Sequence, residues 1–242
     1  MGTFVLVHGA FLGGWCWSRV RDQLQAQGHQ VYTPSLTGLG DRTHLLSGNI
    51  NLQTHVDDVI GVIDSYDLED VVLCGHSYGG LVITGAGNAR ADKIKSLVYL
   101  DALVPEDGQS MFDTVPQAFI DRFEEATAAN DGISTPPMTA EEFGTWPENV
   151  EWVNAHSSNH PTETFRSPVC RTAAWDSIGG KHFILAPAFE HPSTHGYYNE
   201  LKGDPNWQTH ELEGGHHLMV DNPDGVTGLL LKAREANASR SY

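Results

Sequence analysis

Residues 71–89, which decide the fold, read VVLCGHSYGGLVITGAGNA. Residues 71–74 are uniformly apolar, as in a buried strand, and residues 79–89 form an apolar stretch compatible with a helix. The junction between them, residues 75–79, is a G-x-S-x-G sequence. A motif in this setting predicts a sharp turn that carries a serine from a strand into a helix.

Ser77 occupies the centre of that turn and is the predicted nucleophile. The tight bend requires small residues on both sides of the serine, and Gly75 and Gly79 supply them. The strained turn lifts the hydroxyl clear of the sheet, at the positive end of the helix dipole. A chance Gly-Ser turn is the competing interpretation, and the flanking strand and helix disfavour it.

The rest of the chain repeats the strand and helix pattern on both sides of this segment. The strands do not alternate polar and apolar residues, which indicates a mostly parallel sheet covered by helices on both faces. We expect strands at 4–7, 30–33, 71–74, 94–100, 182–185 and 208–212, and helices at 17–27, 52–66, 79–89, 194–202 and 223–238.

The pattern breaks between residues 105 and 178, where prolines and aromatic residues are frequent and no strand is obvious. Short helices are expected there at 118–129 and 140–143. We therefore predict a core of residues 1–104 and 179–242 and a lid insertion of residues 105–178.

The serine needs a base, and histidines at the end of the loop 212–217 can supply it. Two histidines, His216 and His217, are adjacent there, and periodicity does not separate them. The acid that orients the histidine should follow the preceding strand. Glu190 is the carboxylate in the loop that follows strand 182–185, and Asp101, at the end of strand 94–100, is the alternative.

An oxyanion hole should accompany these groups. One donor is the backbone N–H of Tyr78, directly after the nucleophile, and the second is the N–H of Ala10 or Phe11 in the glycine-rich loop after the first strand. Aromatic residues of this loop and of the lid, namely Phe11, Trp146 and Trp152, are expected to bind substrate, although the tryptophans fit an ordinary core equally well.

Composition limits the partners. The chain of 242 residues carries 14 Lys and Arg against 31 Asp and Glu, a formal net charge of −17. Such a surface would repel nucleic acid and anionic membranes, and it favours a small, neutral, largely apolar substrate. The three cysteines, an odd number without metal-like spacing, are typical of reduced thiols, and the N-terminal strand leaves no room for a signal peptide, so we expect a cytoplasmic protein.

No cofactor or metal is expected. Gly38-Leu39-Gly40 lacks the lysine of a P-loop, no dinucleotide-binding glycine motif is present, and the histidines show no zinc-like spacing.

Three motifs together resemble the plant methyl esterases and hydroxynitrile lyases. They are Val7-His8-Gly9-Ala10 with the following Gly13-Gly14-Trp15, the serine motif, and Glu213-Gly214-Gly215-His216-His217. Segments such as Asp101-Ala102-Leu103-Val104-Pro105 resemble bacterial esterase relatives of that group, including pyrethroid hydrolases and an enzyme that cleaves a methyl carbamate on an aromatic heterocycle. The resemblance implies an α/β-hydrolase fold with a helical lid.

The same resemblance assigns the catalytic histidine to His217 and an aspartate to a position within one residue of Glu190, where glutamate is a departure. It also implies that a lyase would carry a threonine at Ala10 and a lysine at Leu218, after the histidine. Neither is present, which favours hydrolysis.

We therefore expect a serine hydrolase of a small carboxylic ester or methyl carbamate, with Ser77, His217 and Glu190 as the catalytic residues and Ala10 and Tyr78 forming the oxyanion hole. The alternatives are carbon–carbon lyase chemistry on the same scaffold and a ligand-binding protein without catalysis.

Overall fold

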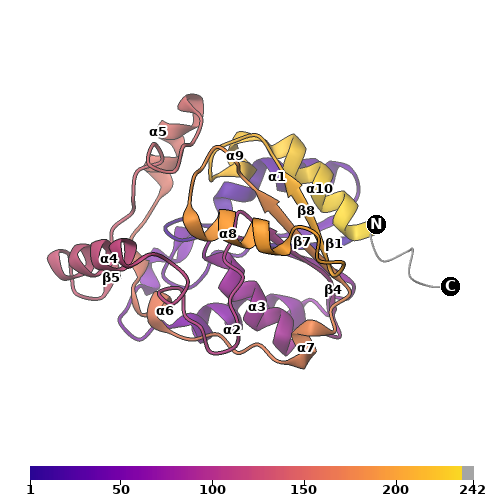
Figure 1. Cartoon of the computed structure of the whole chain (residues 1–242), viewed down its shortest axis with the longest axis horizontal. Coiled ribbons are helices and arrows are strands. Elements are labelled where there is room, and N and C mark those ends of the chain that lie inside the picture. The colour runs from indigo at the N-terminus through magenta and orange to yellow at the C-terminus, as the bar shows by residue number, and fades with distance from the viewer. Residues whose placement is uncertain (236–242) are drawn as a thin grey trace.

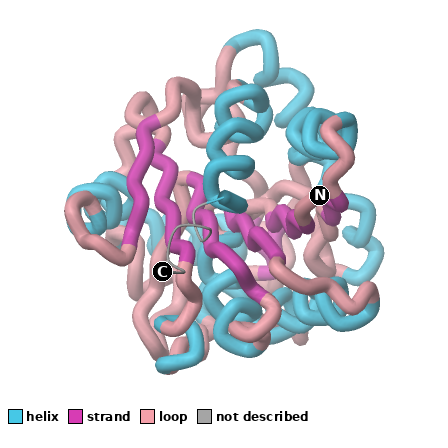
Figure 2. The backbone as a smooth tube through the Cα atoms, turned by 90° about the vertical axis from the view of Figure 1, so that its right-hand side faces the viewer, coloured by secondary structure: helices cyan, strands magenta, loops and turns pink. Residues whose placement is uncertain are grey.

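The computed structural model describes residues 1–235, and the last three residues of the predicted C-terminal helix lie outside this range. Its centre is a six-stranded sheet in the order β2-β1-β3-β4-β7-β8, in which every neighbouring pair is parallel. The strands are β1 Thr3–Val7, β2 Gln30–Tyr32, β3 Val71–His76, β4 Ile94–Leu100, β7 Gly180–Leu185 and β8 Trp207–Glu211. Figure 2 shows them side by side.

Helices cover both faces of the sheet (Figure 1). Helices α1 Ser18–Ala26 and α10 Pro223–Glu235 pack together on one face, and α2 Leu52–Ser65, α3 Gly79–Ala89 and α8 Pro192–Leu201 lie on the other. The predicted fold class is confirmed, and β4 and α3 begin and end where the sequence predicts. Three short helices complete the core: η1 Gly14–Trp17, η2 Gly40–Leu45 and α9 Leu218–Asp221.

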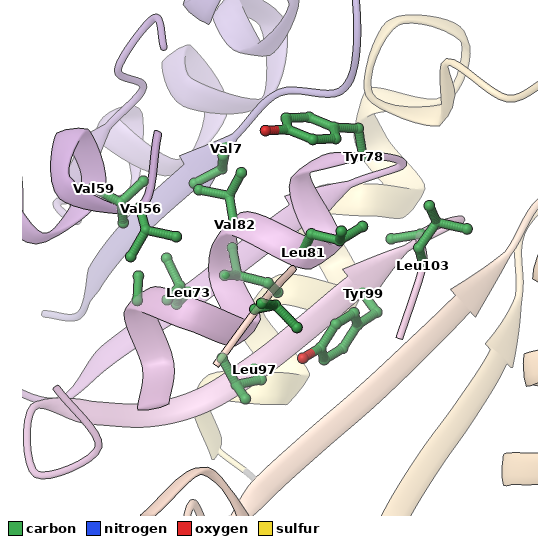
Figure 3. Close-up of a cluster of buried hydrophobic side chains, with 14 of the residues drawn as sticks. Val7, Val56, Val59, Leu73, Tyr78, Leu81, Val82, Leu97, Tyr99 and Leu103 are labelled. Carbon is green, nitrogen blue, oxygen red and sulfur yellow. The ribbon is translucent and has the colours of Figure 1, made fainter. Parts of the chain in front are cut away.

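Burial on both faces explains why the central strands β1 and β3 are apolar along most of their length. Leu73 packs into the cluster beneath α2 and α3, while Val72 and Cys74, its neighbours in β3, pack into the cluster beneath α1 and α10. Successive side chains of a strand point to opposite faces, so a strand between two helical layers needs apolar residues at every position. Figure 3 shows the first cluster, with Val56 and Val59 of α2 near Leu73 and Val82.

The chain between β4 and β7 contains no strand of the main sheet. It forms α4 Gln117–Ala129, β5 Ser134–Thr135, α5 Pro147–His156, β6 His160–Pro161, α6 Glu163–Arg166 and α7 Ala173–Asp176. β5 and β6 make a small antiparallel pair, which the sequence did not indicate. The helix expected at 140–143 is instead a series of turns, and α5 follows it with Pro147 at its start. In Figure 1, α4 and α5 extend to the left, away from α10.

No helix among residues 1–235 is long and apolar enough to cross a bilayer. Within the same range, no group of three or more His, Cys, Asp or Glu is arranged to hold a metal ion. The three cysteines are free thiols, with Cys16 and Cys74 buried and Cys170 exposed.

Candidate active site

Ser77 lies at the sharp turn between β3 and α3, and its φ of +53° is in the left-handed region that non-glycine residues rarely adopt. The turn is closed by contact between backbones. A Cβ added at Gly75 would lie 2.5 Å from the carbonyl oxygen of Gly79, and one added at Gly79 would lie 2.8 Å from that of His8. Only glycine fits at either position, so the sequence motif and the strained turn have the same physical cause.

Asp101 and His216 form a buried pair beside the serine. Asp101 follows β4, with a φ of +44°, and its Oδ2 is 2.6 Å from Nδ1 of His216. Because the carboxylate accepts, Nδ1 carries the proton and Nε2 is left as the basic nitrogen. The backbone N–H of Ala186, after β7, donates to Oδ1 of Asp101 at 3.3 Å. Ser77, Asp101 and His216 line the same cavity.

The expected pair, His217 and Glu190, is not brought together. Nδ1 of His217 is hydrogen-bonded to Oγ1 of Thr145 at 2.7 Å, and its side chain does not line the cavity of Ser77. Glu190 is exposed and does not line that cavity. The geometry therefore selects the two alternatives, Asp101 and His216, because β4 adjoins β3 and its carboxyl end lies beside the nucleophile.

With His216 rather than His217 paired with the acid, the residue that follows the catalytic histidine also differs from the one expected. It is His217 rather than Leu218, and burial, with a smaller contribution from His216, lowers the pKa of His217 to about 3. The imidazole is neutral at physiological pH. The position that would hold a cation in a hydroxynitrile lyase therefore carries no charge here.

The loop of His216 is fixed by hydrogen bonds from two sides. Nε2 of His76, next to the nucleophile, donates to the carbonyl of His216 at 2.9 Å, and the N–H of His216 donates to the carbonyl of Phe143 at 2.9 Å. Asp221 accepts from the N–H of Gly215 at 3.1 Å, from the N–H of Trp146 and from Nδ2 of Asn149. Residues 143–149 of the insertion are thus attached to the catalytic loop.

The two tryptophans expected at the substrate site lie elsewhere. Trp152 packs edge-on against Trp15, with ring centroids 4.9 Å apart, and the backbone N–H of Trp146 donates to Asp221. Neither tryptophan lines the cavity of Ser77, and the packing interpretation holds for Trp152. Phe11, the third expected residue, does line it.

Hydrogen bonding in the loop after β1 distinguishes Ala10 from Phe11 as the second donor of the oxyanion hole. The N–H of Phe11, at a φ of +66°, donates to Nδ1 of His160 at 3.4 Å. Within residues 1–235, no hydrogen bond is found for the N–H groups of Ala10 and Tyr78. Both remain available to a developing oxyanion, as the sequence predicts.

Buried histidines surround this loop, a feature that the sequence did not reveal. His55 donates from Nε2 to the carbonyl of Thr37 at 2.9 Å, so its Nδ1 accepts from the hydroxyl of Tyr78 at 2.9 Å. His160 is stacked on Phe165 at 4.3 Å. Burial lowers the pKa of His55 to about 4 and places that of His160 well below its usual value. The polar groups behind the nucleophile are therefore neutral.

The buried histidines predict that the folded protein loses stability in acid. His8, His55 and His217 are fully buried, with pKa values lowered by burial to about 4, about 4 and about 3. Below pH 6.5 the unfolded chain binds protons that the native state excludes, so stability falls as the pH falls towards 4. Each histidine contributes about 1.4 kcal/mol per pH unit to the slope of the unfolding free energy against pH. The three together contribute about 4 kcal/mol per pH unit.

Urea unfolding between pH 7 and pH 5, above the range of carboxylate titration, measures this slope. His217→Gln should reduce it by about one proton. A free energy of unfolding that stays constant over this interval would contradict the neutral state of these side chains.

The cavity opens beside Ser77, Asp101 and His216. Its walls are mostly aromatic and thioether side chains. They include Phe11, Phe119, Phe123, Phe143, Phe189, Met111 and Met138. Such walls suit a flat, apolar group placed against the serine.

Comparison with known proteins identifies the family of the chain. The model of the alpha/beta hydrolase family matches residues 4–229. The carbendazim hydrolyzing esterase of Nocardioides sp. (strain SG-4G) is 40% identical over 93% of this chain and 96% of its own length. Methylesterase 10 of Arabidopsis thaliana is 30% identical over 94% of this chain and 90% of its own. An extracellular alpha/beta-hydrolase from a Paenibacillus species superposes with a TM-score of 0.81 at 24% identity, covering 96% of this chain and 99% of its own.

The chain therefore belongs to the α/β-hydrolase family. Within the family it is an esterase of the plant methylesterase-like group.

Proposed function

We propose that this esterase hydrolyses a methyl carbamate or methyl ester of a flat aromatic group, with carbendazim as the leading candidate, through an acyl-enzyme on Ser77. One observation carries the proposal: Ser77 and the Asp101–His216 pair meet in one aromatic-walled cavity. The likeness to an esterase named for carbendazim, over nearly the whole chain, supports the choice of substrate.

In the first half-reaction, Nε2 of His216 takes the proton of Ser77 as the serine oxygen attacks the carbonyl carbon. The N–H groups of Ala10 and Tyr78 stabilise the oxyanion, and Asp101 stabilises the imidazolium. The bond from the carbonyl carbon to the methoxy oxygen then breaks, and the His216 proton passes to the departing methanol.

In the second half-reaction, water gives a proton to His216 and attacks the acyl carbon, and Ser77 regains its proton as it leaves. From a carbamate the product is a carbamic acid, which loses CO₂ to give the free amine. No step requires a cofactor.

Two features distinguish this proposal from the alternatives. The neutral His217 offers no cation for a cyanide leaving group, which disfavours lyase chemistry. A binding protein without catalysis has no need for a carboxylate 2.6 Å from a histidine beside a strained serine. The acidic net charge of −17 also suits a neutral substrate.

Incubation of the purified chain with carbendazim, followed by chromatography, tests the proposal. We expect equimolar 2-aminobenzimidazole and methanol from the unsubstituted chain and neither from Ser77→Ala. Turnover of methyl 2-naphthoate without any turnover of carbendazim would exclude the carbamate. Cyanide release from mandelonitrile would identify a lyase instead.

A further inference from the structure

His191 is a buried imidazole in the otherwise apolar wall of the catalytic cavity. Its side chain is 9% exposed and lies between two aromatic walls. The ring of Phe189 is nearly parallel to it, at 13° and 5.7 Å, and that of Phe119 meets it edge-on at 4.9 Å. Nothing in the acyl-transfer steps uses this residue.

The position of its proton follows from the backbone. Nδ1 of His191 accepts from the N–H of Ser193, 3.3 Å away, at the start of α8. A neutral imidazole that accepts at Nδ1 carries its proton on Nε2. Among the residues that the structure describes, no acceptor is paired with this Nε2–H.

The charge state of the ring is also fixed. Burial, followed by the nearby His216, lowers the pKa of His191 to about 4, against a smaller opposing effect of Asp101. The ring is therefore neutral at neutral pH and presents an N–H donor without a positive charge. This N–H has no partner among the described residues and His191 lines the cavity, so an acceptor on a bound ligand can pair with it.

We propose that Nε2–H of His191 donates a hydrogen bond to an acceptor atom on the aromatic group of the substrate, and so selects heteroaromatic substrates over carbocyclic ones of the same shape. The acceptor is a ring nitrogen in the plane of the aromatic system, because the walls of Phe119 and Phe189 favour a flat group in this part of the cavity. This proposal rests on the proposed function, whose substrate class it narrows.

Two pairs of substrates that differ in one ring atom test the hydrogen bond. Methyl quinoline-2-carboxylate and methyl naphthalene-2-carboxylate are the ester pair, and the methyl N-carbamates of 2-aminoquinoline and 2-aminonaphthalene are the carbamate pair. For each substrate, kcat/KM is measured for the original chain and for His191→Phe. The ratio of kcat/KM for the original chain to kcat/KM for His191→Phe, taken on the same substrate, cancels the intrinsic reactivity of that substrate.

His191→Phe should lower kcat/KM about 10-fold for each quinoline and less than 2-fold for each naphthalene, as expected for one neutral hydrogen bond. His191→Gln, which restores an N–H donor, should recover most of the loss. His195→Phe removes an imidazole of α8 that does not line the cavity, and it should change kcat/KM by the same factor for both members of a pair.

Equal losses on quinoline and naphthalene substrates, or no loss on either, would overturn the proposal. If His191→Phe fails to fold because the contact at Ser193 is lost, His191→Ser, whose hydroxyl keeps an acceptor there and is too short to reach the position of Nε2, provides the same comparison. Failure of the carbamate pair alone would count against the carbamate part of the proposed function, with carbendazim as its leading candidate, since the ester pair still measures the hydrogen bond.

Discussion

Replacing Ser77 or His216 with alanine should each lower kcat by about 10⁵- to 10⁶-fold on a methyl ester, and the double variant should be no slower than either. The two side chains act as one unit, since the serine oxygen is nucleophilic only while the histidine takes its proton, and in such units the losses do not add. The measurement is kcat by methanol release, with circular dichroism to show that each variant is folded.

His217→Ala is the matched control for His216→Ala, because it removes the neighbouring imidazole with its hydrogen bond to Thr145 and its ring contacts with Phe143 and His76. It should cost less than about 10-fold, as expected for a side chain that positions a loop. A large loss from His217→Ala together with an active His216→Ala would restore the assignment that the sequence resemblance implies.

Asp101→Asn should lower kcat by about 10⁴-fold. Oδ1 of Asp101 already accepts from the N–H of Ala186, so the new amide nitrogen would face Nδ1 of His216. That nitrogen would donate to Nδ1 and move the histidine proton to Nε2, where it blocks the base. The stabilisation of the imidazolium by the carboxylate would be lost as well.

Glu190→Gln tests the other carboxylate. It removes the charge of an exposed side chain outside the cavity and should leave kcat within 2-fold of the original value. The reverse pattern, an active Asp101→Asn and an inactive Glu190→Gln, would require the 185–191 loop to rearrange and would contradict the geometry described above.

With His216 as the base, the residue at the position of the lyase cation changes, and the expectation of hydrolysis stays the same. The resemblance implied that His217 is the catalytic histidine and that Leu218 follows it. The absence of a lysine at Leu218 then favoured hydrolysis. In the structure the following residue is His217, whose buried ring is uncharged at neutral pH. The site lacks a cation for a different reason, and hydrolysis remains the favoured chemistry.

The sequence by itself determined the sheet, its helices and the sharp turn that carries Ser77, the proposed nucleophile. These depend on local causes: strands covered on both faces must be apolar throughout, and the turn at Ser77 closes only with glycine at positions 75 and 79. It also indicated the free N–H groups of Ala10 and Tyr78, which are set by the loops that directly follow two strands.

Only the tertiary structure distinguished among the candidate acids and bases and formed the walls of the cavity. His216 and His217 are adjacent in the chain, but their rings have different partners, Asp101 and Thr145, which lie 115 and 72 residues away in sequence. Asp101 takes the place expected for Glu190 because neighbouring parallel strands bring their carboxyl ends to one edge, where a hydrogen bond depends on distance in space and not on order along the chain.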